Sequence, residues 1–452
     1  MLILHKATIV TAEKEAVGSI VIEEGRIAEV FYADEQDFDF RIFKLMKDNP
    51  QAEIRNLESK HIMAGGIDAH VHFREPGLTH KADMFTESRA AVAGGVTTVF
   101  DMPNTNPPTV TAEALKSKIE TAEGRSLAKI GFHIGATNSN SEMICNLVKN
   151  GDSDSGVAPD DIAGVKIFMG SSTGNMLVDS GDSLEKLFAI KEKPVLVHCE
   201  EEAMIRTNTA AAKEKYGEDI PFREHENIRS RKACIMSSIK ALELAIKHGT
   251  RMTLCHISTK EEVEMVRAAK INNPYIIAET SCNYLWFSNE DYGRLGSRVK
   301  CNPSVKTPED RDALRKALAD GLIDTIGSDH APHLTDEKAG CYTKAPSGLP
   351  SIQQSLSVLL TIAKEEDIPL TVIASAFSEK ASEVYKLDRG KIQTGYAADL
   401  VIFDYNSEFM VRNEDQFSKC GWTPYDGTVL HGKIESVLID GMTVFREGEI
   451  TA

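Results

Sequence analysis

The chain has 452 residues, of which 42% are hydrophobic and 26% charged, a composition typical of a globular protein with a large core. Asp and Glu outnumber Lys and Arg by 68 to 51, which gives a formal net charge of −17 at pH 7. This acidity argues against nucleic acid or an anionic membrane as a partner, although a small anionic substrate would need only a few local positive groups.

The first residues lack the basic and long apolar segments of a signal peptide. The sequence contains no run of about 18 apolar residues, so no membrane-spanning helix is expected. The eight cysteines are scattered and form no Cys-x-x-Cys pair, so neither a disulfide framework nor a zinc ribbon is expected. A reducing cytoplasm is therefore the expected location.

Both ends of the chain predict β-structure. Strand-like runs occur at 2–11, 18–22, 399–404, 434–439 and 442–445. Gly25-Arg26 and Asp440-Gly441 are typical of hairpin turns, and the charged segment 34–60 is expected to be partly helical. We therefore predict a small β-sandwich-like domain assembled from residues 1–60 and 386–452.

The middle of the chain, residues 61–385, alternates apolar strand-like runs with amphipathic helical patterns. The runs lie at 67–73, 97–102, 129–136, 163–169, 194–200, 252–258, 275–281 and 323–329. Eight β-then-α units predict an α/β fold, a TIM-like (β/α)8 barrel that forms the catalytic domain. A doubly wound sheet is the alternative, but it would not need eight strands of similar length.

The first of these strands carries His70, His72 and Arg74. Alternate residues of a strand point the same way, so the two imidazoles can bind one metal ion, and the arginine follows on the same side. For an isolated His-x-His, two structural histidines in the core would be an equally good explanation.

The other strand ends decide between these explanations, because active sites of such barrels lie at the C-terminal ends of the strands. Those ends supply Asn104, His198, His256, Asp329, His330 and His333. So many potential ligands in one barrel indicate a metal site. The number suits two ions, one bound by His70 and His72 and the other by His198 and His256, and neutral imidazole suits zinc.

Lys166 lies within the apolar run 163–169. A protonated lysine beside two metal dications would be unfavourable in a poorly solvated place. A neutral amine can instead add carbon dioxide to form a carbamate, whose two oxygens and negative charge would bridge both ions. The alternative is a lysine whose ammonium group extends outward to solvent.

Two long motifs, Asp68-Ala-His-Val-His-Phe-Arg-Glu-Pro-Gly77 and Gly327-Ser-Asp-His-Ala-Pro-His-Leu-Thr-Asp-Glu-Lys338, resemble signatures of the metal-dependent amidohydrolase superfamily. Within its cyclic-amidase branch the resemblance is closest to the dihydroorotases, and it covers nearly the whole chain. It implies two Zn²⁺ per chain, held by His70, His72, Lys166, His198, His256 and Asp329. Lys166 would be N6-carboxylated as the bridge. Some relatives bridge with an aspartate instead, for which Asp152, Asp154 and Asp179 are the candidates.

The resemblance also implies a reaction, the reversible cyclisation of N-carbamoyl-L-aspartate to L-dihydroorotate in de novo pyrimidine biosynthesis. Asp329 would carry the proton, and Arg74 would bind the substrate carboxylate. Further candidates for substrate binding are Asn104, Asn302, His333 and Gly348. The expected partners are this small substrate and a second copy of the chain in a homodimer.

Hydantoinase or dihydropyrimidinase, and allantoinase, share such a metal site and are the alternatives, as is an inactive homologue that serves as a scaffold. Arg74 favours a substrate with a ring carboxylate. Segments 281–284 and 347–353 depart from the pattern of many relatives and bear on specificity. Loop 170–174 lacks the Gly-Lys-Ser/Thr ending of a P-loop, so it is not expected to bind phosphate.

Overall fold

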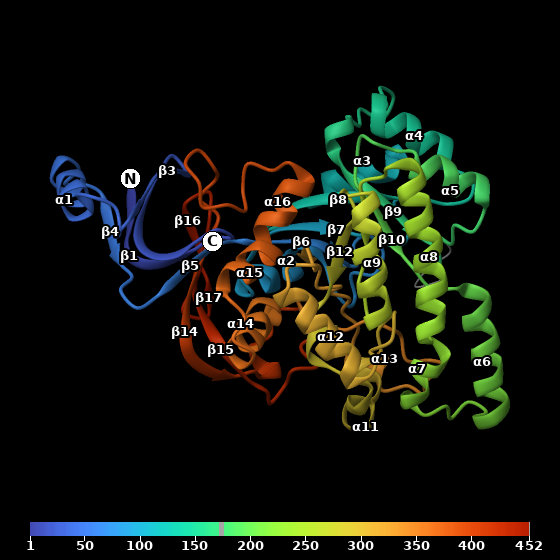
Figure 1. The fold of residues 1–452 in the computed structure, drawn as a ribbon. Helices are drawn as coiled ribbons and strands as arrows, with labels where there is room; N and C mark the ends of the chain where they lie inside the picture. Colours follow the sequence, from blue (N-terminus) through green and yellow to red (C-terminus); the bar gives the residue numbers. More distant parts are fainter. Residues whose placement is uncertain (171–175, 452) are drawn as a thin grey trace.

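The computed structural model describes residues 1–170 and 176–451, so most of loop 170–174 lies outside the described residues. An eight-stranded parallel sheet runs in the order β6 to β13 and curls into a barrel (Figure 1). A parallel bridge between Val71 and His330 joins its two edge strands. The predicted (β/α)8 barrel is confirmed.

Each barrel strand coincides with one of the predicted apolar runs. The strands are β6 (Gly66–Val71), β7 (Val96–Asp101), β8 (Lys129–Gly135), β9 (Ile162–Phe168), β10 (Val195–His198), β11 (Met252–Leu254), β12 (Ile277–Thr280) and β13 (Thr325–Ile326). Most of these strand residues are buried, because helices cover the outer face of a parallel sheet while side chains fill its interior.

The covering helices follow the strands in sequence. They include α2 (Met84–Ala93), α3 (Ala112–Ala122), α4 (Ser141–Asn150), α5 (Gly181–Phe188), α6 (Glu202–Tyr216), α8 (Arg231–His248), α9 (Lys260–Asn272), α12 (Pro308–Ala319) and α14 (Ser355–Glu365). Helix α9 illustrates why they form. Thr259 caps its first turn by accepting a hydrogen bond from the Glu262 N–H, and Val263, Val266 and Ala269 recur on one buried face.

The two ends of the chain form a separate nine-stranded sheet, as predicted. Its strands are β1 (Leu2–Val10), β2 (Glu15–Glu23), β3 (Arg26–Tyr32), β4 (Glu53–Asn56), β5 (His61–Ala64), β14 (Leu400–Met410), β15 (Val429–Ile439), β16 (Met442–Arg446) and β17 (Glu449–Ile450). Strand β5 joins the two halves, because it pairs with β1 on one side and with β14 on the other. The exact domain limits stay a prediction.

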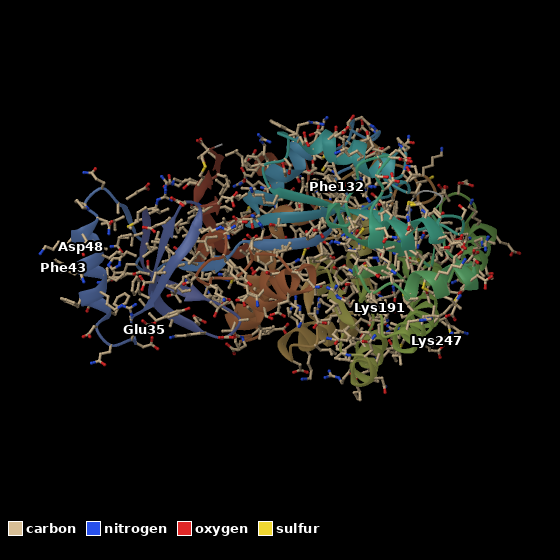
Figure 2. The ribbon with its side chains drawn as sticks, turned by 90° about the horizontal axis from the view of Figure 1, so that it is seen from above. Glu35, Phe43, Asp48, Phe132, Lys191 and Lys247 are labelled. Carbon is tan, nitrogen blue, oxygen red and sulfur yellow. The ribbon has the colours of Figure 1, made fainter. Side chains whose placement is uncertain are left out.

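The predicted hairpin turns are present in this sheet, where Gly25, Asp440 and Gly441 all have positive φ. The charged segment 34–60 contains helix α1 (Phe38–Asp48), which lies at the end of the molecule away from the barrel (Figures 1 and 2). All eight cysteines are free thiols. Within the described residues, every helix is too short or too polar to cross a lipid bilayer.

A buried ion pair ties the end of β6 to the next strand. Asp101, at the end of β7, accepts a hydrogen bond from the Phe73 N–H at 2.7 Å. Lys118 of α3 lies 2.6 Å from the other carboxylate oxygen and donates to the Met102 carbonyl oxygen, and neither side chain is exposed. Because Phe73 stands between His72 and Arg74, this pair positions the segment that carries both.

Replacing Lys118 by Met should lower the free energy of unfolding by about 3–5 kcal/mol, because Asp101 would keep a buried charge without its partner. Urea denaturation measures the change. The double variant Lys118→Met/Asp101→Asn is the control and should lose much less. A single variant as stable as the unmodified protein would show that the pair does not act in this way.

Candidate active site

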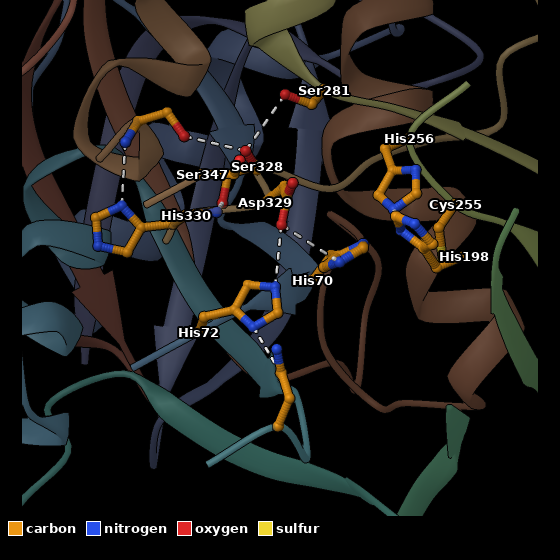
Figure 3. Close-up of polar contacts among 12 residues, drawn as sticks. His70, His72, His198, Cys255, His256, Ser281, Ser328, Asp329, His330 and Ser347 are labelled. Atoms are coloured by element: carbon orange, nitrogen blue, oxygen red, sulfur yellow. Dashed lines mark hydrogen bonds and ion pairs between the residues drawn. The ribbon is translucent and has the colours of Figure 1, made fainter. Parts of the chain in front are cut away.

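The first group of predicted ligands lies where β6 and β13 end at the mouth of the barrel (Figure 3). His72 Nε2 lies 3.0 Å and His70 Nε2 lies 3.5 Å from the same oxygen of Asp329. Asp329 has a φ of 50°, a conformation uncommon for residues other than glycine, and its carboxylate reaches both imidazoles. The structure therefore brings Asp329 to two histidines that precede it by more than 250 positions.

The second group adjoins the first. His198 ends β10, and His256 follows β11. His198 Nδ1 lies 2.9 Å from His256 Nε2. The ring centroids of His256 and His70 are 5.3 Å apart, so the four imidazoles form one cluster (Figure 3). Nδ1 of His256 is buried and has no hydrogen-bond partner among the described residues.

Lys166, on β9, is fully buried and therefore does not extend to solvent. Its Nζ lies 3.3 Å from Cys255 Sγ, and it forms no ion pair among the described residues. The alternative bridging aspartates lie in other surroundings. Asp152 accepts hydrogen bonds from Ser155, Asp179 is exposed and accepts one from Asn138, and Asp154 is exposed. Among the candidate bridging residues, Lys166 is the one that lies beside the histidine cluster.

Each of three cluster imidazoles has a second polar partner, which fixes the orientation of its ring. His70 Nδ1 lies 2.8 Å from Glu279 Oε1, and His72 Nδ1 lies 2.9 Å from Asn104 Oδ1. His198 Nε2 lies 3.0 Å from Glu200, which also pairs with Arg229. Such partners are typical of metal-binding histidines.

Glu279 and Glu200 were not among the predicted site residues. The available signal was a carboxylate within or at the end of an apolar strand, which needs a buried partner. Asn104 was predicted as a substrate residue, and that role stays a prediction beside its contact with His72.

The electrostatics of this cluster suit metal binding. Burial, and then the nearby Lys166, lowers the pKa of His70 well below its ordinary value, so its imidazole is neutral, the form that binds metals. Burial raises the pKa of Glu279 to about 7. The four imidazoles, the Asp329 carboxylate and the Lys166 amine are a donor set that fits zinc. Ligand atoms of His70, His72 and Asp329 already lie within 4.8 Å of one another.

Beside the histidine cluster lies a second, cationic region. The Arg74 side chain is buried, with Nε donating to the Pro332 carbonyl oxygen at 3.1 Å and Nη2 lying 3.0 Å from His333 Nε2. It forms no ion pair among the described residues. Burial lowers the pKa of Arg74 to about 10, because the guanidinium charge has lost part of its hydration.

The predicted residue Gly348 lies next to His333: a Cβ placed on it would be 3.1 Å from His333 Nε2 and 2.7 Å from the Ala331 carbonyl oxygen. Its φ of 127° also favours glycine. The Gly348 N–H donates to the Lys300 carbonyl oxygen, two residues before Asn302. Asn302 is buried, and its Oδ1 has no hydrogen-bond partner among the described residues.

Two buried lysines hold the loop that contains Gly348 through its main chain. The Lys338 ammonium group donates to the carbonyl oxygens of Pro346 and Gly348. The Lys300 ammonium group donates to those of Tyr342 and Ala345. Burial lowers the pKa of Lys338 to about 7 and that of Lys300 to about 8.

The second departing segment, 281–284, supports the site from behind. The Ser281 hydroxyl and the Asn283 side-chain amide both donate to the carbonyl oxygen of Ser328, at 3.3 and 3.2 Å. Ser328 directly precedes Asp329, so these contacts position the carboxylate of Asp329 from the side opposite the histidines. In this chain the segment thus has a structural role.

Comparisons with known proteins agree with this arrangement. Residues 61–444 match the sequence pattern of the amidohydrolase family. A dihydroorotase of Methanosarcina mazei is 33% identical over 420 residues, which cover 90% of this chain and 86% of the relative. An allantoinase of Desulfitobacterium hafniense is 29% identical over 467 residues, which cover 100% of this chain and 96% of the relative.

Solved structures show the same fold. The L-hydantoinase of Arthrobacter aurescens superposes with a TM-score of 0.88 at 24% sequence identity, covering 100% of this chain and 97% of that chain. The resemblance drawn from the two signature motifs is confirmed. The chain belongs to the amidohydrolase family and, within it, to the enzymes that hydrolyse cyclic amides.

Proposed function

We propose that this protein is a dihydroorotase, which interconverts N-carbamoyl-L-aspartate and L-dihydroorotate in de novo pyrimidine biosynthesis. The dihydroorotases of archaea and bacteria at 31–33% identity support this assignment. The observation that carries it is the buried guanidinium of Arg74, which has no carboxylate partner among the described residues.

An unpaired buried charge is costly, so such a group is best explained by an anionic ligand that completes it. Arg74 presents a planar set of donors that matches a carboxylate. Dihydroorotate carries a carboxylate on its ring and carbamoyl-aspartate has the same carboxylate, whereas hydantoin, dihydrouracil and allantoin have none on the ring. Arg74 therefore favours dihydroorotate over the substrates of the related enzymes.

The residues of the cluster would hold two zinc ions, His70 and His72 one, His198 and His256 the other, with carboxylated Lys166 as the bridge. When bound, zinc would supply an activated water and polarise the amide carbonyl. Asp329 takes the proton of the attacking water and delivers it to the leaving ring nitrogen. Its carboxylate oxygen lies 3.0 Å from His72 Nε2, next to the atoms that would hold the metal.

A substrate panel tests the assignment. Dihydroorotate, hydantoin, dihydrouracil and allantoin are offered to the purified protein, and its metal content is measured in parallel. Turnover of dihydroorotate at a kcat/KM at least tenfold above the others is expected. Allantoin is included because the allantoinase relative spans the whole chain, and a preference for it would overturn the proposal.

Arg74→Met should raise the KM for dihydroorotate roughly 100-fold, because charge-assisted hydrogen bonds to a carboxylate contribute about 1.5–3 kcal/mol. The ligand-free variant should unfold at a higher urea concentration, since an uncompensated buried charge is removed. Arg74→Lys is the matched control, because it keeps the charge but lacks the planar guanidinium. Its KM should lie between that of the unmodified enzyme and that of Arg74→Met. An unchanged KM would remove the carboxylate role.

Lys166→Ala should lose the bridge and with it the second metal ion, as measured by elemental analysis of the dialysed protein. Activity should return in part when short carboxylates or bicarbonate are supplied. Lys149→Ala, at an exposed position of α4, is the control and should bind metal normally. Full metal content in Lys166→Ala would contradict the carbamate.

Asp329→Asn should lower kcat by about 10²–10⁴-fold, the range typical of a lost general acid–base group. Because asparagine keeps the size of the side chain, the histidine ligands and the bound metal should remain. Elemental analysis together with kcat separates these effects. A kcat near that of the unmodified protein would show that another group carries the proton.

A further inference from the structure

A chain of charged contacts runs from the surface to the buried guanidinium of Arg74. Glu337, which is partly exposed, lies 2.8 Å from Lys81 Nζ. Lys81 is buried, and its Nζ lies 3.1 Å from Nδ1 of His333. The other ring nitrogen of His333, Nε2, lies 3.1 Å from the carbonyl oxygen of Ser347 and 3.0 Å from Nη2 of Arg74.

These contacts do not all suit one form of the imidazole. An ammonium and a guanidinium only donate, and a carbonyl oxygen only accepts. With the proton on Nε2, His333 accepts from Lys81 at Nδ1 and donates to Ser347, so two of its three contacts are hydrogen bonds. With the proton on Nδ1, it would accept from Arg74, but Lys81 would face an N–H and the Ser347 carbonyl would receive no hydrogen.

The surroundings of His333 keep the ring neutral. Burial, and then the charges of Arg74, Lys81 and Lys338, lowers its pKa far below the ordinary value. Among the described residues, Glu337 is the carboxylate that pairs with the ring, 3.6 Å from Nδ1, and its closer partner is Lys81. The neutral ring therefore carries one N–H proton, and its neighbours determine whether Nδ1 or Nε2 carries it.

We propose that Lys81 is a positioning residue that selects the Nε2–H form of His333, so that this N–H, which donates to Ser347 in the absence of substrate, can be shared with the substrate carboxylate beside the donors of Arg74. Two donors 3.0 Å apart repel each other without an acceptor between them, and a carboxylate oxygen accepts from both. In the Nδ1–H form, His333 would instead take a hydrogen from Arg74 and compete with the substrate. The inference rests on the proposed function and adds Lys81 to it.

The protonation of the ring can be observed directly by ¹⁵N NMR of the full-length protein labelled at histidine, with the His333 signals assigned from the spectrum of His333→Asn. The unmodified protein should show an unprotonated Nδ1 and a protonated Nε2. Lys81→Met should shift the ring towards Nδ1–H, because Arg74 is then the remaining side-chain donor, and Lys81→Arg should restore Nε2–H. A protonated Nδ1 in the unmodified protein would overturn the inference, and this measurement needs no variant of Lys81.

Kinetics supply the second readout. Lys81→Met should raise the KM for dihydroorotate about tenfold and change kcat much less, and Lys81→Arg should recover most of the loss. Equal KM values for Lys81→Met and the unmodified enzyme would contradict the role. If the tautomer depends on Lys81 but dihydroorotate is not turned over, the proposed function fails and the positioning stands. If dihydroorotate is the substrate and the tautomer of His333 is the same in Lys81→Met as in the unmodified protein, only the inference about Lys81 fails.

Discussion

The closure of the barrel between its first and last strands is the constraint on which the site depends. The parallel bridge from Val71 to His330, with the His72 N–H donating to the His330 carbonyl oxygen, places the end of β6 against the segment after β13. It brings Asp329 to the two histidines of the first motif, and His333 to Arg74. The seam thus joins the part of the histidine cluster formed by His70, His72 and Asp329 to the cationic region around Arg74.

The histidine cluster and the region around Arg74 differ in the charge of their buried side chains. In the cluster, burial favours the neutral imidazole of His70, and Lys166 forms no ion pair among the described residues. In the region around Arg74, the side chains of Arg74, Lys81 and Lys338 are buried, and the ion pair that they form among the described residues is that of Lys81 with Glu337. A protein with a net charge of −17 thus concentrates buried cations beside its active site.

Much of the fold could be predicted from the sequence, because buried parallel strands are continuous apolar runs, and several of them end near a recognisable residue such as His198 or His256. The orienting partners Glu279 and Glu200 could not be identified, since a lone acidic residue near a strand end carries no sign of which imidazole it meets. The contact of Lys81 with His333 was equally hidden. It depends on how two loops 252 positions apart pack, a tertiary property that no local pattern reports.

The loop around Gly348 has a consequence of another kind. Its backbone is stabilised by the ammonium groups of Lys338 and Lys300, which donate hydrogen bonds to main-chain carbonyl oxygens. Every residue has such a carbonyl, whatever its side chain. Its path is therefore largely independent of its own side chains, glycine 348 excepted. Such a loop can vary in sequence while its backbone stays in register beside the pocket. That freedom offers a physical route by which amidohydrolases of one architecture come to recognise different rings.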